Sequence, residues 1–428
     1  MKTSISRRHF VKTTAFAGAT LAALNKIPSL KAESANNKIR VAVMGVHGRG
    51  MDHINAILNI PDVELAYVCD VDAHVLASAI KHVESKGKKA PQGVNDFRKI
   101  LDDKSVDAIT IATPNHWHAI AAIMACSAGK HVYVEKPGSH DPNEAELLVK
   151  AARKNNRVVQ LGTQRRSSPS ITQAIEKVHS GAIGRALFAR CWYNSARSSI
   201  GHGKTVPVPD WLDFTLWQGA APDRPYVDNL VHYNWHWRWH WGNGELGNNG
   251  IHVLDLARWG LGAGLPKRVT CSGARYYYND DQETPDTYLV GFDFGDKGAS
   301  FEGHSCNSHG LENAATGVLF YGDKGSLAIA DKVWRIYDGK NKVVEEQPVK
   351  FDNVTHFANF FDCIRSGKKP NADIGEGQQS TLLCHLGNIA WRTGHTINFD
   401  PATRKIVNDP DAGALWQREY RPGWEPKV

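Results

Sequence analysis

Short, almost wholly apolar runs alternate with longer stretches of helical periodicity in the first part of the chain. Runs that are apolar on both faces are typical of parallel strands buried between helices. The alternation therefore predicts a doubly wound, parallel α/β domain over residues 38–162. The expected strands end at residues 44, 70, 113, 134 and 161, and the expected helices cover residues 73–85, 96–101, 119–128 and 142–155.

The hydrophobic pattern changes beyond residue 162, where apolar and polar residues alternate in runs separated by Gly, Asn and Asp. Alternation with short turns is typical of an antiparallel sheet that buries only one face. Residues 163–428 are therefore expected to form a second α/β domain with a large, open, mainly antiparallel sheet. The expected strands cover residues 185–193, 268–277, 287–294, 299–304, 315–321, 326–330 and 333–337, and the expected helices 170–180, 244–258, 355–366 and 377–393.

A glycine-rich turn follows the first apolar strand. The sequence RVAVMGVHGRG at residues 40–50 places Gly45, Gly48 and Gly50 between that strand and a helical pattern. A strand, a glycine turn and a helix N-terminus together form a site for a pyrophosphate. The order is G-x-x-G-x-G, with His47 at the second usual glycine position, so the motif alone is a weak signal. His47 and Arg49 complete the expected contacts of this turn with a dinucleotide.

Asp70 strengthens the prediction of a dinucleotide site. It ends the second expected strand, about 25 residues after Gly45. A carboxylate at this spacing accepts hydrogen bonds from a ribose diol and repels a 2′-phosphate. The sequence therefore favours NAD over NADP, with Asp72 as the adjacent alternative to Asp70.

Two polar motifs follow later strands of the same domain. TPNHWH at residues 113–118 follows one expected strand, and EKP at residues 135–137 follows the next. Ligands of doubly wound sheets bind outside the carboxyl ends of the strands, so both motifs are expected at the cofactor site. The residues assigned to it are Thr113, Pro114, Asn115, His118, Glu135 and Lys136.

The glycine-rich start, T-P-N-x-x-H after one strand and E-K-P after the next together resemble the Gfo/Idh/MocA family of oxidoreductases. The resemblance covers nearly the whole chain after the N-terminal segment. It implies a Rossmann-type first domain and an open sheet in the second domain, with one face towards the active site. It also implies that Lys136 lies beside the nicotinamide and the substrate hydroxyl. Pro114, Asn115 and His118 match positions that line the nicotinamide side.

Residues 244–258, GELGNNGIHVLDLAR, are the expected chemical centre of the second domain. The family usually has D-x-G-x-H here, with the acid and the histidine one helical turn apart. In this chain the histidine is His252, and Asn248 replaces the acid. Asn248 can orient a substrate hydroxyl but cannot act as a base. We predict His252 as the acid/base, because an imidazole titrates near neutral pH, and Lys136 as its electrostatic partner.

A dense aromatic and histidine-rich run precedes this centre, and the chain has 13 tryptophans. Flat tryptophan rings suit the apolar faces of sugars, but a tryptophan-rich core is an equally open interpretation. His236 and His240 are four residues apart, as metal ligands can be, but no convincing carboxylate or cysteine completes a set, so no metal is expected. The residues assigned to substrate are Arg165, Trp235, His236, Trp237, Arg238, His240 and Asn249.

The N-terminus resembles a twin-arginine export signal. Residues 6–12 read SRRHFVK and are followed by an alanine-rich, moderately apolar stretch. That stretch is too short to remain in a bilayer, and small residues end it near residue 35. We therefore expect a signal peptide over residues 1–35 and a periplasmic or otherwise exported protein. The twin-arginine route carries folded proteins, which suits a chain that binds a nucleotide before export.

Composition narrows the range of partners. The 428 residues carry a formal charge of +7, without a long Lys/Arg run after the N-terminal segment, so nucleic acid is not expected. No other segment reaches the apolar length of a membrane helix. The seven cysteines have neither C-x-x-C nor zinc-type spacing and are read as core residues.

The leading hypothesis is an exported NAD(P)-dependent oxidoreductase that acts on a secondary alcohol of a sugar, sugar derivative or cyclitol. Because free NAD is scarce outside the cytoplasm, the cofactor is expected to stay tightly bound. One alternative is an NAD-dependent glycosidase or lyase that works through a transient keto-sugar. A second is a non-catalytic sugar-binding protein. By family analogy the chain is expected to form a homo-oligomer, a dimer or a tetramer.

Overall fold

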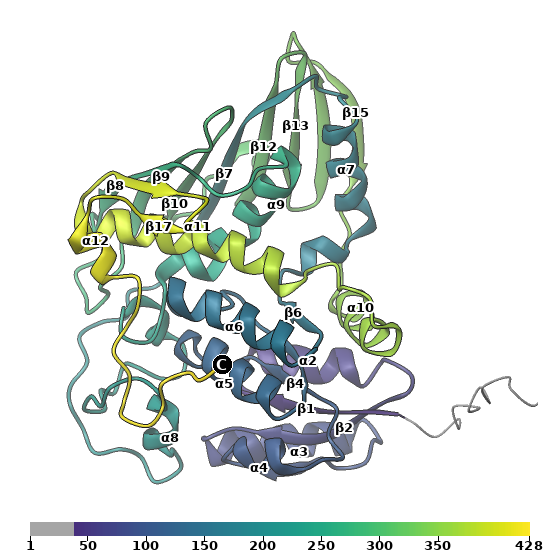
Figure 1. Cartoon of the computed structure of the whole chain (residues 1–428), viewed down its shortest axis with the longest axis vertical. Coiled ribbons are helices and arrows are strands. Elements are labelled where there is room, and N and C mark those ends of the chain that lie inside the picture. Colours follow the sequence, from purple (N-terminus) through teal and green to yellow (C-terminus); the bar gives the residue numbers. More distant parts are fainter. Residues whose placement is uncertain (1–37) are drawn as a thin grey trace, which may run out of the picture. The chain divides into compact units, whose positions relative to one another are not determined.

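The computed structural model describes residues 38–428, which form one compact unit from residue 39 onward (Figure 1). The expected signal peptide at residues 1–35 lies outside the described residues. Two sheets organise the chain, one of six strands and one of eleven. None of the helices in residues 38–428 is both long and apolar enough to cross a bilayer.

The first sheet is parallel throughout and has the strand order β3-β2-β1-β4-β5-β6. This order reverses direction between β1 and β4, and such a point opens a crevice at the carboxyl ends of the strands. The predicted Rossmann-type sheet is confirmed. Its strands are β1 (Ile39–Met44), β2 (Val63–Cys69), β3 (Gln92–Val94), β4 (Ala108–Ile111), β5 (His131–Val134) and β6 (Val159–Leu161).

Helices cover both faces of this sheet, and a separate hydrophobic cluster lies against each face. Asp72 accepts hydrogen bonds from two backbone N–H groups at the start of α3, and Asp141 accepts one from Glu144 at the start of α6. Such N-caps satisfy donors that the first helical turn leaves free. The helices are α2 (Arg49–Ile57), α3 (Ala73–Ser85), α4 (Arg98–Asp102), α5 (Asn115–Ser127) and α6 (Pro142–Lys154).

The second sheet is mainly antiparallel, as predicted, although β7 and β10 pair in parallel. Its main path runs β15-β14-β13-β12-β7-β10-β9-β8-β16-β17, with β11 paired to β7. The strands are β7 (Ala186–Ala196), β8 (Arg268–Ala274), β9 (Thr287–Asp293), β10 (Gly298–His304), β11 (Cys306–Asn307), β12 (Thr316–Gly322), β13 (Gly325–Ala330), β14 (Val333–Asp338), β15 (Val343–Pro348), β16 (Ile397–Asp400) and β17 (Lys405–Ile406).

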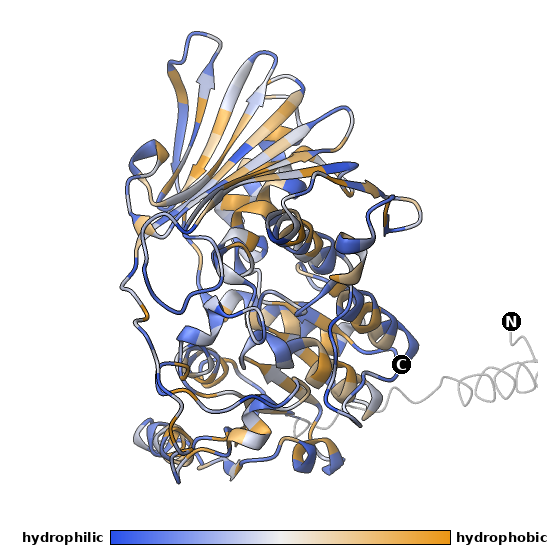
Figure 2. Ribbon diagram, turned by 90° about the vertical axis from the view of Figure 1, so that its left-hand side faces the viewer, coloured by the Kyte–Doolittle hydropathy of each residue, from blue (hydrophilic) through white to orange (hydrophobic). Residues whose placement is uncertain are grey.

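One face of the second sheet packs on helices and forms the largest hydrophobic cluster. On β9, Tyr288, Val290 and Phe292 are buried, whereas Leu289 on the opposite face is 48% exposed. Figure 2 shows the apolar residues of the strands alternating with polar ones. The packed helices are α7 (Pro169–His179), α9 (Ile251–Leu261) and α11 (Ile374–Thr393), while α10 (Asn353–Ser366) contacts α2 of the first domain.

The structure differs from the predicted elements in a few places. The helix expected over residues 244–258 begins as a π-helical turn, η3 (Leu246–Gly250), before α9. The edge strand β15 was not predicted, because almost all of its residues are exposed and no alternation marks it. The other unpredicted elements are short: β3, β11, β16, β17, α8 (Phe214–Gln218), α12 (Pro410–Ala414), and the 3₁₀ turns η1 (Gln164–Ser167), η2 (Asn234–Trp237) and η4 (Leu311–Asn313).

The connection between β7 and η3 packs against the first domain. We call residues 197–243 the strap. The backbone N–H of Ala73 donates to the carbonyl of Trp211 (2.9 Å), and that of Asp213 donates to the carbonyl of Val71 (3.0 Å). The strap therefore reaches from the second domain to the carboxyl end of β2, where the ribose-binding carboxylate was predicted.

Candidate active site

A cavity of about 340 Å³ opens at the carboxyl ends of β1, β2, β4 and β5. The strap forms part of its wall, through Trp217, His232 and Tyr233 among others. Eleven of the twelve predicted cofactor contacts line it: Gly45, His47, Gly48, Arg49, Asp70, Thr113, Pro114, Asn115, His118, Glu135 and Lys136. Asn248, Trp235 and His236 line the same cavity.

The remaining cofactor residue, Gly50, lies outside this lining and shapes the turn instead. A Cβ atom at Gly50 would lie 1.8 Å from the carbonyl oxygen of Gly45. Gly45 has a φ of +80°, and a Cβ there would lie 2.7 Å from the carbonyl oxygen of Ala112. Two glycines therefore let the turn and the start of α2 pack tightly above β1 and β4, which keeps the cavity floor free of side chains.

The floor also presents polar atoms that suit a dinucleotide. The carboxylate of Asp70 accepts hydrogen bonds from the N–H groups of Val46 (2.8 Å) and Asp72 (3.0 Å), which fix it at the cavity. The buried hydroxyl of Thr113 has no hydrogen-bond partner among residues 38–428. A carboxylate has further lone pairs for a ribose diol, and a buried hydroxyl without a partner is costly. The site therefore fits a nicotinamide dinucleotide.

Glu135 is the centre of a buried ion-pair network beneath the cavity. Its Oε1 accepts from Arg49 Nε (2.7 Å) and Gln164 Nε2 (3.1 Å) and lies 3.1 Å from His53 Nε2. Burial alone would raise the pKa of Glu135, but Arg49, His53 and the adjacent Lys136 outweigh it and hold that pKa well below its usual value. Glu135 is thus a fixed negative charge next to Lys136 rather than a proton donor.

The acid stability of the fold should depend on this carboxylate. A folded-state pKa below the ordinary value of 4.5 means that Glu135 stabilises the fold above that pH and loses this contribution as pH falls through the folded pKa. Glu135→Gln is therefore expected to unfold at a lower temperature at neutral pH and to show a shallower loss of melting temperature between about pH 5 and pH 3. Melting curves of the native protein and of Glu135→Gln over this pH range test the prediction. The same pH dependence of both melting temperatures would contradict it.

Lys136 and Asn248 meet in the cavity. Lys136 Nζ donates to the backbone oxygen of Asn248 (2.7 Å) and to its side-chain Oδ1 (3.0 Å). An ammonium group has three N–H donors, so one remains for a ligand. Burial lowers the pKa of Lys136, and Glu135 opposes that shift. Lys136 therefore combines a free donor with easier proton loss than an exposed lysine, and its role as electrostatic partner stays a prediction.

His118 holds the EKP turn in place. Its Nδ1 lies 2.6 Å from the carbonyl oxygen of Pro137, and its Nε2 lies 2.8 Å from that of Thr113. The ring thus bridges the TPNHWH and EKP motifs, which follow neighbouring strands. Burial lowers the pKa of His118, so the ring is neutral and its single N–H donates to one of these two carbonyl oxygens. His118 lines the cavity, and we assign it a positioning role next to Lys136.

Tyr233 is a further polar residue of the cavity lining. Arg197 Nη1 donates to the Tyr233 hydroxyl (3.0 Å), and Arg197 Nε donates to Glu245 Oε2 (2.5 Å). Asn248 Nδ2 lies 3.5 Å from the same hydroxyl. Tyr233 belongs to the aromatic run, and only its contacts distinguish it from its neighbours. Arg197 and Glu245 are not among the lining residues and contact Tyr233 and Asn248 through hydrogen bonds.

The predicted substrate residues do not all meet at the cavity. Trp235 and His236 line it, and His236 Nδ1 donates to the carbonyl of Tyr233 (2.6 Å), which leaves Nε2 with its lone pair. Burial lowers the pKa of His236 to about 3, so the ring is neutral at physiological pH. Trp237 is buried, and the Arg197 guanidinium lies 4.8 Å from its ring centroid.

The other predicted substrate residues contact protein groups away from the cavity. Arg238 donates to Asn229 Oδ1 (2.8 Å) and Asp281 (3.0 Å), and His240 Nε2 lies 2.7 Å from the carbonyl of Pro222. Asn249 Nδ2 donates to Glu245 Oε1 (2.5 Å), and Arg165 lies in η1. These arrangements favour packing and positioning for this group.

His252 lies on α9, one helical turn after Asn248, and is not among the residues that line the cavity. Its Nδ1 is buried and has no hydrogen-bond partner among the described residues. Burial lowers the pKa of His252 well below its usual value, and the charges of Lys136 and Arg165 add to that shift. This lowered pKa departs from the near-neutral titration on which the prediction is based, and the acid/base role of His252 stays a prediction.

A histidine pair closes the ribose end of the cavity. The rings of His47 and His232 are stacked with centroids 4.5 Å apart, and His232 Nε2 lies 2.9 Å from Asp72 Oδ2. His232 belongs to the strap, whereas His47 belongs to the glycine turn. The pair therefore joins the strap to the turn beside Asp70. Within residues 38–428, no group of three or more His, Cys, Asp or Glu side chains could hold a metal ion.

This fold and cavity define a two-domain protein of the dinucleotide-binding oxidoreductase class. Three family models match the chain. They are described as "Oxidoreductase family, NAD-binding Rossmann fold" at residues 39–163, "GFO/IDH/MocA C-terminal domain" at 171–328 and "Oxidoreductase family, C-terminal alpha/beta domain" at 318–426. Together they span almost all described residues. The chain belongs to the Gfo/Idh/MocA family.

The chain is similar to curated proteins over about half or less of their length. It is 31% identical over 253 residues to a "Glycosyl hydrolase family 109 protein" of Saccharopolyspora erythraea, covering 52% of this chain and 55% of that protein. It is 32% identical over 169 residues to "Levoglucosan dehydrogenase" of Pseudarthrobacter phenanthrenivorans, covering 39% of this chain and 36% of that protein.

Solved structures share the fold over a greater length. One is the WlbA dehydrogenase of Bordetella pertussis, whose structure is in complex with NADH and UDP-GlcNAcA. Its TM-score is 0.66 at 20% identity, and the match covers 85% of this chain and 99% of that one. This likeness supports the domain arrangement and leaves the substrate open.

Proposed function

We propose that this protein is an NAD-dependent oxidoreductase that transfers a hydride at a secondary alcohol of a sugar, sugar derivative or cyclitol. The observation that carries the proposal is the Lys136–Asn248 pair, which lies in the same cavity as the glycine turn and Asp70. Relatives named as a levoglucosan dehydrogenase and an inositol 2-dehydrogenase support the substrate class.

The residues of the cavity suit this chemistry. When bound, the nicotinamide exchanges a hydride with the carbon that carries the alcohol. The free N–H of Lys136 binds the oxygen of that alcohol and stabilises the negative charge that develops as the proton leaves. Asn248, held by Lys136, orients a neighbouring hydroxyl through its amide. Glu135 keeps a compensating charge beside Lys136 in either protonation state of the lysine.

Two histidines are candidates for the proton acceptor. His252 is the residue that the sequence predicts, and its neutral ring lies near the Lys136 charge. His236 lines the cavity itself and has a free Nε2 lone pair. Loss of activity in His252→Ala with unchanged cofactor binding supports the first, and the same result in His236→Ala supports the second. Full activity in both variants contradicts both assignments.

We propose that NAD is preferred and stays tightly bound. Asp70 at the ribose end repels a 2′-phosphate, and the His47–His232 pair places the strap over the same end. A retained cofactor suits export by the twin-arginine route and work in the periplasm, which we propose from residues 6–12. Cell fractionation tests the export. The processed chain is expected in the periplasmic fraction, and retention of the protein inside the cell would contradict the proposal.

A second candidate function is a glycosidase or lyase reaction on the same site. Oxidation of one sugar carbon makes the neighbouring C–H acidic, which permits elimination of a substituent and leaves a double bond. In a glycosidase, water then adds to this double bond; in either reaction, reduction of the keto group restores the alcohol. The replacement of the family's acid by Asn248 and the relative named as a glycosyl hydrolase favour this candidate. A non-catalytic sugar-binding role is the third possibility, and the retained Lys136 and His252 oppose it.

Cofactor content and product formation separate these functions. The purified full chain is expected to release NAD(H) on denaturation, and Asp70→Asn to retain less, because the ribose loses a charged acceptor worth about 1.5–3 kcal/mol. Glycosides are then added while nicotinamide absorbance and aglycone release are followed. A net change in nicotinamide absorbance supports the dehydrogenase. Release of aglycone without a net change in absorbance supports the glycosidase. A chain that binds no NAD(H) would contradict both.

We further propose a homo-oligomer that uses the outer face of the second sheet. Leu187, Phe188, Leu289 and Tyr321 are at least 37% exposed there, and exposed apolar patches often mark interfaces. Light scattering of the purified chain tests the dimer or tetramer, and a monomer at all concentrations contradicts it.

A further inference from the structure

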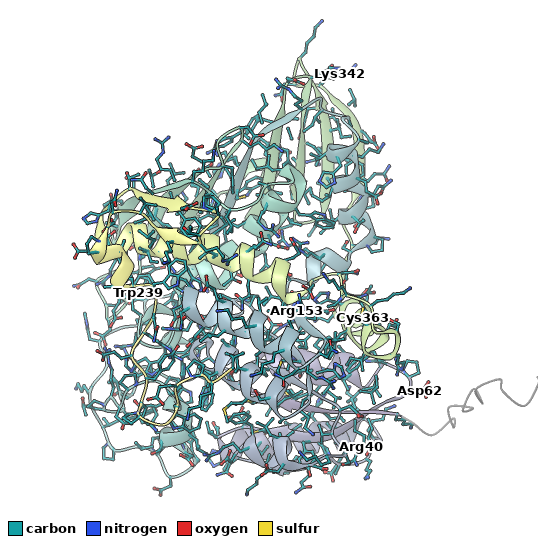
Figure 3. All side chains as sticks on the ribbon, viewed as in Figure 1. Arg40, Asp62, Arg153, Trp239, Lys342 and Cys363 are labelled. Carbon is teal, nitrogen blue, oxygen red and sulfur yellow. The ribbon has the colours of Figure 1, made fainter. Side chains whose placement is uncertain are left out.

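A second cavity, of about 350 Å³, shares no lining residue with the first. Its walls come from the start of α6, strap residues 222–224 and 239–243, the C-terminal half of α11, and residues 415–419. Segments distant in sequence therefore meet around it. Figure 3 labels Trp239, one of its wall residues, beside the yellow C-terminal elements. The proposed oxidoreductase chemistry uses none of these residues.

Several buried polar atoms in this wall lack partners. Both ring nitrogens of His140, Oδ1 of Asn243 and Nη1 of Arg418 are buried and make no hydrogen bond with any described residue. Asn243 is only 3% exposed. A buried polar group without a partner costs about 1–3 kcal/mol, so such groups are rare unless a ligand or water completes them. Three side chains with such atoms, His140, Asn243 and Arg418, lie around this one cavity and indicate a polar ligand.

Two further guanidinium groups at this cavity have free donors. Within residues 38–428, the side chains of Arg224 and Arg392 make no hydrogen bond and no ion pair. Instead, Arg392 lies 5.2 Å from the ring centroid of Trp239 and Arg224 lies 5.9 Å from that of Trp241. Stacking orients a guanidinium while leaving its N–H edge free. Together with Arg418 Nη1, these donors favour a carboxylate, whose two oxygens match the planar fork of arginine.

The acidic residues of the wall do not cancel this charge. Asp223 is paired with Arg421. Asp141 accepts hydrogen bonds from the backbone N–H groups of Glu144 and Arg418. Glu419 is exposed to solvent. Glu283, which accepts from the backbone N–H of Trp239 (2.6 Å), is a further carboxylate near Arg392. Arg224 and Arg392 are exposed like Glu419, and neither guanidinium is hydrogen-bonded to a carboxylate within residues 38–428.

We propose that this second cavity binds a carboxylate-bearing sugar such as a uronic acid. The carboxylate would be bound by Arg392 and Arg224. The hydroxyl groups would donate to Asn243 Oδ1 and exchange hydrogen bonds with His140 and Arg418. A phosphate ion at neutral pH has only one or two O–H donors, whereas a sugar has several hydroxyl groups that both donate and accept. This proposal is independent of the reaction in the first cavity.

Calorimetric titration of the full chain tests this site with four probes: glucuronate, glucuronamide, glucose and inorganic phosphate. Glucuronamide keeps the shape of glucuronate but lacks its charge. Glucuronate is expected to bind saturably and at least about ten-fold more tightly than the other three. Absence of glucuronate binding, equal binding of glucuronamide, or equal binding of phosphate would each overturn the proposal.

Variants locate the binding. Arg392→Ala is expected to weaken glucuronate binding by at least about ten-fold, because one charge-assisted bidentate contact is lost. Two control variants are expected to leave glucuronate binding at the second cavity unchanged. Lys150→Ala removes an exposed cation of α6 outside the cavity, and Lys136→Met changes the first cavity. Loss of binding only in Lys136→Met would overturn the second site. Unchanged melting temperatures of the variants show that folding is not responsible.

Discussion

Replacement of Lys136 by methionine is expected to lower kcat for a sugar substrate by about 10²–10⁴-fold while NAD stays bound. Methionine keeps much of the apolar volume of lysine but removes the ammonium that contacts Asn248 (2.7 and 3.0 Å). The developing negative charge on the substrate oxygen then has no positive partner at that position. Single-turnover kinetics with the co-purified cofactor measure the effect apart from cofactor exchange.

Lys136→Arg is the matched control, because it keeps the positive charge. Arginine does not titrate in the accessible pH range, whereas burial lowers the pKa of Lys136 from 10.5. The native protein should therefore show an alkaline limb in its pH–rate profile below the ordinary lysine range, and this limb should be absent in Lys136→Arg. Activity near the native level in Lys136→Met, or an unchanged limb in Lys136→Arg, would refute the role of Lys136.

The second large effect is expected from Gly50→Ala. The added methyl group would lie 1.8 Å from the carbonyl oxygen of Gly45, which is backbone and cannot rotate away. The start of α2 must then move from the glycine turn, and the backbone donors of the turn move with it. We expect a loss of about 3 kcal/mol in stability and a large loss of bound NAD. Thermal melting and cofactor content after purification measure both.

Gly48→Ala provides the control for backbone effects at the same turn. Gly48 has a φ of +56°, but an added Cβ there has no atom within 4 Å. The expected cost is therefore a backbone penalty of about 1–3 kcal/mol, without displacement of α2 and with a smaller loss of NAD than in Gly50→Ala. If Gly48→Ala and Gly50→Ala proved equally harmful, backbone conformation rather than the close approach of α2 would be the cause.

Much of the first domain could be predicted from its sequence. Five of its six strands are short apolar runs, β3 being the exception, and the candidate cofactor residues follow such runs. Because parallel strands end at one edge of the sheet, adjacency to a strand end in the sequence becomes proximity in space. This explains why eleven of twelve assigned cofactor residues line one cavity. Gly50 differs because its role is to permit close packing.

The aromatic run could not be divided into its roles in this way. Trp235 and His236 line the first cavity, Trp239 and His240 line the second, and Arg238 contacts Asp281. These residues have similar composition and lie on an irregular segment, so no periodicity assigns them to a face. Their roles depend on how the strap crosses the first domain, which is determined by contacts with residues distant in the sequence.

The sequence by itself determined the two-domain α/β architecture and the position of the polar motifs at the carboxyl ends of parallel strands. It also identified Lys136 and Asn248 as candidate site residues. These depend on local periodicity and on short motifs at element ends. Only the tertiary structure decided that Lys136 contacts Asn248, that Arg197 contacts Tyr233, and that the strap reaches Asp72. These contacts join residues far apart in the chain, and no local pattern of hydrophobic and polar positions encodes them.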